Sequence, residues 1–113
     1  MPPVFELRKN DEDYYYFHFL NGEGELILLS AEYPEKASAE AAINDVRVGS
    51  LTANQIAAGR VAGGETFFVI KDTAGDVLVK SVLYNDRMIF DNALHTVKDN
   101  ACVAEIDDLT AAA

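Results

Sequence analysis

The segment Gly24–Tyr33 has the sequence GELILLSAEY, and the segment Gly75–Tyr84 has the related sequence GDVLVKSVLY. A shift of 51 residues aligns the two halves of the chain without a gap over residues 17–51 and 68–102. Identical residues occupy six of the aligned pairs, which are Phe17/Phe68, Gly24/Gly75, Ser30/Ser81, Tyr33/Tyr84, Ala42/Ala93 and Val46/Val97. These identities fall at a turn, at strand ends and along a helix face, so we interpret the chain as internally duplicated.

The first half carries the patterns of three strands followed by a helix. Alternating apolar residues and aromatic enrichment predict strands at Val4–Arg8, Tyr14–Leu20 and Glu25–Leu29. The following apolar residues have the i, i+3, i+4, i+7 spacing of a helix face, at Ala39, Ala42, Ile43 and Val46. Gly49 is expected to end this helix in a left-handed conformation. The segment Leu51–Gln55 is either a short fourth strand or a linker.

The second half repeats this order of elements. Its helix is predicted over Asp86–Asp99, with Asn100 in the place of Gly49 at the helix end. The apolar face of this helix consists of Phe90, Ala93, Leu94 and Val97. Strands are predicted at Ile56–Ala62, Thr66–Lys71, Asp76–Val82 and Val103–Asp107.

The length of 113 residues fits one domain with one core. Half of the residues are hydrophobic and a quarter are charged, which is an ordinary balance for a globular protein. We therefore predict a single domain over residues 1–113, with the first repeat at 4–54 and the second at 55–110.

The chain carries 19 acidic and 9 basic residues, for a net charge of −10. Binding to DNA or RNA needs Lys and Arg to displace counterions from phosphates, so this charge argues against a nucleic-acid partner. No apolar run approaches the roughly 18 residues of a membrane helix, and the N-terminal residues lack the pattern of a signal peptide. Cys102 is the only cysteine, so no intramolecular disulfide can form. We expect a cytoplasmic protein with no membrane partner.

Both halves carry a glycine turn, an apolar strand ending in Ser, a Tyr three residues later, a basic residue and a helix. The residues of this pattern are Gly24-Glu25-Leu26-Ile27, Ser30, Tyr33, Lys36 and Ile43-Asn44-Asp45-Val46, then Gly75-Asp76-Val77-Leu78, Ser81, Tyr84, Arg87, Leu94-His95-Thr96-Val97 and Asn100-Ala101. As a set they resemble the YegP-like family, whose function is uncharacterised. The resemblance implies β-β-β-α-β units that join into one sheet by exchanging their C-terminal strands, and it implies no activity.

We therefore expect an α+β fold of two tandem β-β-β-α-β repeats, with one antiparallel sheet and both helices on one face. Strand exchange would remove the long exposed edge that a three-stranded sheet leaves open to self-association. Because both units belong to one chain, the exchange can be internal. We expect a monomer built as a pseudo-dimer rather than a homodimer.

Few residues carry catalytic or metal-binding chemistry. His18 and His95 lack a metal-ligand spacing and are assigned structural or surface roles, and Cys102 that of a buried small hydrophobe. Ser30 and Ser81 would act as nucleophiles only beside a base, which the two halves do not supply at equivalent positions. We expect their hydroxyls to bond backbone groups where strand gives way to loop. We predict no catalytic residue, no metal ligand and no cofactor.

Lys36 and Arg87 occupy aligned positions in the first turn of the two predicted helices. A cation there opposes the helix dipole. Two interpretations stay open: the pair binds an anion at the helix N-termini, or each side chain is solvated or paired with a nearby carboxylate.

The predicted sheet has an unusually apolar second face. If the helices cover the face that bears Phe17 and Phe68, the opposite face is also rich in apolar side chains. The residues expected there are Tyr14, Tyr16, His18, Phe67 and Val69. Either sheet twist and loops cover this face, or it is an interface for a protein or peptide partner or for self-association.

The favoured hypothesis is a non-enzymatic interaction or structural module that uses this open aromatic face. The alternative is a small-molecule or anion-binding protein or an enzyme, with a site near the strand-helix joints. The joints contain Ser30, Tyr33, Ser81 and Tyr84. An enclosed concave site would favour the alternative, and a flat exposed apolar patch would favour the interaction module.

Overall fold

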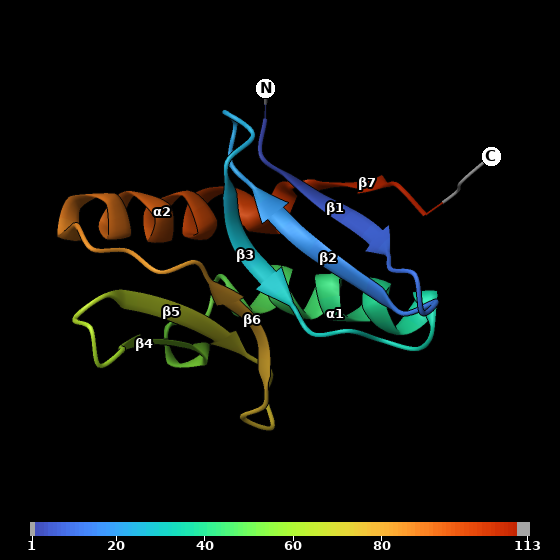
Figure 1. The fold of residues 1–113 in the computed structure, drawn as a ribbon, viewed down its shortest axis with the longest axis horizontal. Helices are drawn as coiled ribbons and strands as arrows, with labels where there is room; N and C mark the ends of the chain where they lie inside the picture. The colour runs from blue at the N-terminus through green and yellow to red at the C-terminus, as the bar shows by residue number, and fades with distance from the viewer. Residues whose placement is uncertain (1, 111–113) are drawn as a thin grey trace.

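A seven-stranded sheet and two α-helices form the two layers of the computed structural model, which describes residues 2–110 (Figure 1). The strands are β1 (Val4–Lys9), β2 (Tyr15–Leu20), β3 (Leu26–Ser30), β4 (Ile56–Arg60), β5 (Thr66–Lys71), β6 (Val77–Ser81) and β7 (Glu105–Asp108). The helices are α1 (Lys36–Gly49) and α2 (Arg87–Asn100), with short 3-10 helices η1 (Ala53–Gln55) and η2 (Ala101–Val103). The predicted α+β class is confirmed.

The strand order is β4-β5-β6-β3-β2-β1-β7, so the two halves meet where β3 pairs with β6. Neighbouring strands are antiparallel except β1 and β7, which run parallel with Val4 opposite Glu105 and Leu7 opposite Asp108. The sheet is therefore mixed, whereas the sequence predicted an antiparallel one. A hairpin turn would make two joined strands antiparallel. The chain instead reaches β7 through α2, on the helix layer, and this route allows β7 to run parallel to β1.

Both helices cover the same face of the sheet, as predicted. Phe17 and Phe68 on this face are fully buried, together with Ile43 of α1. Phe90 of α2 packs edge-on against Phe68, with 5.7 Å between the ring centroids. One continuous core therefore lies between the sheet and the helices, and within residues 2–110 no second layer covers the opposite face of the sheet.

Two β-bulges determine which side chains of the central strands face the core. β3 shifts register against β2 at Leu20, and β6 shifts against β5 at Lys71. The extra residues are Ile27 and Leu78, which are 51 positions apart and both buried. A bulge changes the alternation of inward and outward side chains along a strand, so simple period-two counting fails in β3 and β6.

Tight turns also recur at the 51-residue spacing. Gly24 and Gly75 have φ values of 81° and 92°, and Asp13 and Gly64 have values of 66° and 93°. Glycine adopts this left-handed region without steric cost, and Asp is one of the residues that tolerates it best. The hairpin turns are thus specified at the same places in both halves.

The predicted left-handed helix ends are wrong. Gly49 is not among the glycines with positive φ, and Asn100 has a φ of −120°. Gly49 serves a different purpose, because a Cβ atom at this position would lie 2.7 Å from Cγ2 of Ile70. The glycine allows the end of α1 to approach β5 closely.

The uncertain segment after α1 is a linker and not a strand. Residues 53–55 form η1, which leads directly into β4. Strand exchange is therefore one-sided: β7 of the second half pairs with β1 of the first, but within residues 2–110 no strand pairs with the outer edge of β4. A parallel neighbour for β4 could not come from residues 50–55, because a parallel connection needs about a dozen residues or more.

Candidate binding face

The face of the sheet opposite the helices, called here the open face, carries a row of side chains that crosses all seven strands. Each member of the row is directly opposite the next in the strand register. In order from β7 to β4 the row consists of Asp107, Glu6, His18, Leu29, Lys80, Val69 and Ala57. The open face is therefore mixed in character: carboxylates lie at one edge, Lys80 lies near the middle beside Leu29, and the apolar Val69 and Ala57 lie toward the other edge.

Tyr16 and His18 form the aromatic part of the open face on β2. Their rings lie 5.3 Å apart between centroids, and both side chains are half-buried. Beside them on β1, Arg8 donates from Nη2 to Oε1 of Glu6 over 2.8 Å. Burial lowers the pKa of His18, and the neighbouring Arg8 guanidinium lowers it further. A neutral imidazole at pH 7 lets this cluster meet an apolar surface at low electrostatic cost.

Phe67 and Val69 form a second apolar group on β5. The Lys80 ammonium lies 4.7 Å from the centre of the Phe67 ring, in a cation–π contact. Val69 is only 9% exposed although no helix covers it. Phe67 is half-buried, like Tyr16 and His18, whereas Tyr14, in the turn before β2, is 41% exposed.

The structure separates the five residues that the sequence placed on one face. β3 and β6 lie between β2 and β5, and adjacent strands are about 4.8 Å apart. The groups around Tyr16 and Phe67 are thus two patches on the open face, joined by the side chains of the two central strands.

Sequence reasoning missed the two central residues, Leu29 and Lys80. Leu29 is 37% exposed and pairs with both His18 and Lys80, at the middle of the row. The apolar run of β3 has no alternation, so nothing in it marks Leu29 as outward-facing. The signal was available in the second half, because a lysine inside β6 must face solvent, and Lys80 aligns with Leu29.

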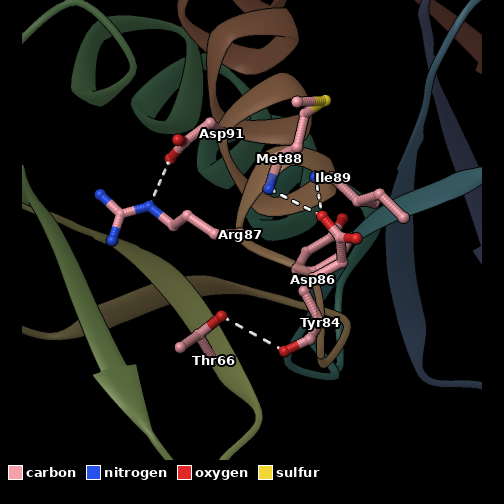
Figure 2. Close-up of polar contacts among 7 residues, drawn as sticks. All are labelled: Thr66, Tyr84, Asp86, Arg87, Met88, Ile89 and Asp91. Atoms are coloured by element: carbon pink, nitrogen blue, oxygen red, sulfur yellow. Dashed lines mark hydrogen bonds and ion pairs between the residues drawn. The ribbon is translucent and has the colours of Figure 1, made fainter.

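The two aligned cations are held differently. Lys36 places Nζ 2.5 Å from Oδ2 of Asp108, which ties the start of α1 to the end of β7. Arg87 donates from Nε to Oδ1 of Asp91 over 3.0 Å, and its guanidinium extends away from the first turn of α2 (Figure 2). The two helix starts lie on opposite sides of the molecule (Figure 1), so the structure does not bring these cations together.

We expect the carboxyl group of Asp108 to titrate well below the ordinary value for an aspartate. The hydrogen bond from Lys36 and those from Thr110 lower the pKa of Asp108 from 3.8 to about 2. Because the folded pKa is depressed, the stability from this pair is complete above about pH 4 and is lost as pH falls toward 2. NMR titration of the side-chain carboxyl carbon checks the value. A Lys36→Met variant should raise the midpoint, and an unchanged midpoint would contradict the assignment to Lys36.

The serine hydroxyls bond backbone groups, as the sequence analysis expected. Oγ of Ser30 accepts from the Phe17 N–H over 2.8 Å and donates to the Ala31 carbonyl over 2.7 Å. Oγ of Ser81 accepts from the Phe68 N–H over 2.9 Å and donates to the Val82 carbonyl over 2.8 Å. Both hydroxyls hold the end of a strand, so neither has the arrangement of an activated nucleophile.

Tyr33 and Tyr84 complete the same strand-helix joints. The backbone of Tyr33 exchanges two hydrogen bonds of 2.7 Å with Tyr15, and Tyr84 exchanges bonds of 2.7 and 2.8 Å with Thr66. Burial raises the pKa of both phenols. These tyrosines are therefore structural parts of the joints.

The other candidates for chemistry are dispersed. His95 lies 2.8 Å from Asp99, measured from Nε2 to Oδ2, on the exposed side of α2. Cys102 is partly exposed in η2, and not fully buried as predicted. Within residues 2–110, no three His, Cys, Asp or Glu side chains gather as metal ligands would. Neither helix in that range has the length and apolar character needed to cross a membrane.

A hollow of about 440 Å³ lies between the β2–β3 turn and α2. Of the four residues at the strand-helix joints, Tyr84 alone lines it. Glu23 and Glu25 also line it, so the hollow does not suit an anion. This arrangement does not favour a small-molecule or anion site at the joints.

Comparisons with known proteins place the chain in a family. Residues 10–56 match the model of a domain of unknown function, DUF1508. The chain is 31% identical to the UPF0339 protein YegP of Yersinia pestis over 106 residues, covering 94% of this chain and 95% of that protein. A UPF0339 protein of Pseudomonas aeruginosa is 30% identical over 108 residues, covering 96% of this chain and 98% of that one.

Solved structures agree with this assignment. The solution NMR structure of a UPF0339 protein from Shewanella oneidensis superposes with a TM-score of 0.91 at 28% identity, covering 97% of this chain and 93% of that one. That of yegP from E. coli, a protein of unknown function, gives 0.90 at 27% identity, covering 100% and 97%. The chain therefore belongs to the UPF0339 (YegP) family, whose function is unknown.

Proposed function

We propose that the chain is a non-enzymatic interaction module that binds a partner protein through the open face of its sheet. The observation that carries this proposal is the absence of a second layer over the open face within residues 2–110, although the face bears Tyr16, His18 and Leu29. A sheet that faces water on one side ordinarily alternates apolar and polar residues more cleanly. Aromatic side chains that remain accessible are typical anchors of protein interfaces.

The distribution of charge suggests the chemistry of the partner. Glu105 and Asp107 of β7 are exposed at the edge beside the aromatic group, and the chain has a net charge of −10. Complementary charge speeds encounter and orients partners. We propose a partner surface with an apolar centre for Tyr16 and Leu29, and with basic side chains that meet the β7 edge.

A Tyr16→Glu variant should test the proposal directly. The substitution puts a charge at the centre of the proposed contact, and we expect affinity for the partner to fall by about tenfold or more. The partner is first captured from native cytosol with the unchanged chain and identified by mass spectrometry. Affinity is then measured with both purified proteins by isothermal titration calorimetry.

A matched control separates the open face from the rest of the surface. Val48 is 60% exposed on α1, so Val48→Glu adds the same charge outside the open face. We expect Val48→Glu to bind normally and both variants to keep the parent circular dichroism spectrum. Normal binding by Tyr16→Glu, or equal loss in both variants, would contradict the proposal. Light scattering that showed a stable dimer disrupted by Tyr16→Glu would replace the partner with a second copy.

A further inference from the structure

The outer edge of β1 is a strand-binding site, called here the β1 seat, and β7 of the same chain occupies it. Ile106 of β7 packs against the core, and Asp108 is paired with Lys36 at the start of α1. The N–H of Leu109 then donates to the carbonyl oxygen of Leu7 over 2.9 Å. Three features thus recognise the strand: an apolar contact, a carboxylate two residues later held by a cation, and a backbone hydrogen bond.

The outer edge of β4 has the counterpart of each feature at the 51-residue spacing. Ile56 aligns with Phe5, which is opposite Ile106 in the β1 seat. Arg87 aligns with Lys36 and Ala58 with Leu7. A hollow of about 400 Å³ marks this position, lined by Ala58, Gly59, Arg60, Thr66, Arg87 and Phe90.

The backbone of β4 is oriented to accept a strand. Phe68 is opposite Ala58, and the Phe68 N–H donates to Oγ of Ser81 on the β6 side. In an antiparallel ladder, opposite residues exchange both hydrogen bonds or neither. Ala58 therefore directs its N–H and C=O away from β5, to the outer edge of β4, where no strand of residues 2–110 pairs with it.

The two edges of the sheet are protected to different degrees. Three of the four residues of β7 are acidic, which discourages further pairing at that edge. β4 has the sequence IAAGR, with a single charge at Arg60. An unpaired edge strand that carries so little charge is a template for strand addition.

We propose that the β4 edge binds an extended segment of a partner protein, parallel to β4, in which an apolar residue is followed two positions later by a carboxylate. The apolar side chain packs beside Ile56, and the carboxylate pairs with Arg87. The backbone hydrogen bonds go to Ala58. The carboxylate beside Arg87 and Arg60 supplies the charge recognition.

The occupant is a different protein, because the β7 strand of a second copy is already engaged. Because β7 is covalently attached to the chain, its effective concentration at the β1 seat is in the millimolar range, and it outcompetes strands of other molecules there. β7 therefore stays on β1 of its own chain. β1 has the same spacing at Val4 and Glu6, but it is paired on both edges, with β2 and with β7.

A peptide with the sequence of residues 104–110, AEIDDLT, is the probe for the β4 edge. Titrated into the full chain and followed by ¹⁵N NMR, it should shift the amide signals of residues 56–60 and of Arg87. Residues 4–9, whose seat is filled by β7, should stay unchanged. Shifts along 4–9, or none along 56–60, would overturn the proposal.

Two charge tests identify the role of Arg87. Arg87→Glu should weaken binding of the peptide by about tenfold, while Lys98→Glu, an equal charge change at an exposed position of the same helix, should have little effect. If Arg87→Glu is poorly folded, the peptide carrying the Asp108→Asn substitution provides the same test on the unchanged protein, with weaker binding expected. Equal binding of the two peptides would overturn the carboxylate assignment.

Two further measurements test the identity of the partner and the location of the site. Dimerisation of the chain through β4, detected by light scattering, would overturn the partner assignment. Tyr16→Glu should leave peptide binding intact, which separates this edge from the open face.

Discussion

Replacing Arg47 with alanine is expected to destabilise the fold by about 2 to 3 kcal/mol. The Arg47 guanidinium donates from Nη2 to the Ala104 carbonyl over 2.6 Å, just before β7. It also lies 5.8 Å from the centre of the buried Phe5 ring. Hydrogen bonds from charged groups contribute more than neutral ones, and the truncation leaves the half-buried carbonyl without this donor.

The consequences of losing Arg47 should be concentrated at one edge of the sheet. Arg47 joins α1 to the segment that enters β7, so hydrogen exchange should accelerate most at the amides of residues 105–108. Urea unfolding gives the free-energy change. The control is Lys98→Ala at the aligned, exposed position on α2, which should change stability by less than about 0.5 kcal/mol. Equal losses in the two variants would show that the contact with Ala104 has no special role.

Replacing Ser81 with alanine is expected to cost about 2 kcal/mol of stability. Ser81 is only 3% exposed, and its hydroxyl bridges the Phe68 N–H and the Val82 carbonyl. Removal leaves a buried donor unsatisfied, which is more costly than the net loss of an exposed hydrogen bond.

Ser30 provides the matched comparison for Ser81. Its hydroxyl makes the same two bonds with Phe17 and Ala31, but its side chain is half-buried and water can replace the hydroxyl more easily. We therefore expect Ser30→Ala to cost about 1 kcal/mol. The two variants are compared by urea denaturation at equal m-values. A larger loss for Ser30 than for Ser81 would refute the burial argument.

Most elements of the fold could be predicted because local patterns specify them. The helical spacing of Ala39, Ala42, Ile43 and Val46 identified the buried face of α1, and all four are buried. The glycines at 24 and 75 identified tight turns because their left-handed conformations exclude most other residues. These signals come from the periodicity and the backbone chemistry of short segments.

Features that depend on distant parts of the chain could not be predicted in the same way. Nothing near Glu105 indicates that β7 runs parallel to β1. The direction of β7 depends on the end of the sheet at which α2 delivers the chain. The glycine at 49 suggested a helix cap, but the reason for it is the side chain of Ile70 in β5. Long-range packing decided both cases.

The open face was predicted in part. Period-two alternation correctly separated Phe17 from Tyr16 and His18 on β2. It failed at Leu29, because the bulge at Ile27 changes the alternation and is invisible in an all-apolar run. The distance between the aromatic groups on β2 and β5 also needed the strand order, which places two strands between them.

The pairing of β7 with β1 has a consequence for synthesis of the protein. Val4 and Glu105 are neighbours in the sheet although a hundred residues of chain separate them. Contacts between such distant residues close late in folding, since the loop entropy is lost before the contact is gained. During translation β1 is synthesised long before β7, so the β1 edge remains unpaired until residues 105–108 have been made. The nascent chain therefore passes through a long interval in which its N-terminal half exposes a strand edge to other nascent chains.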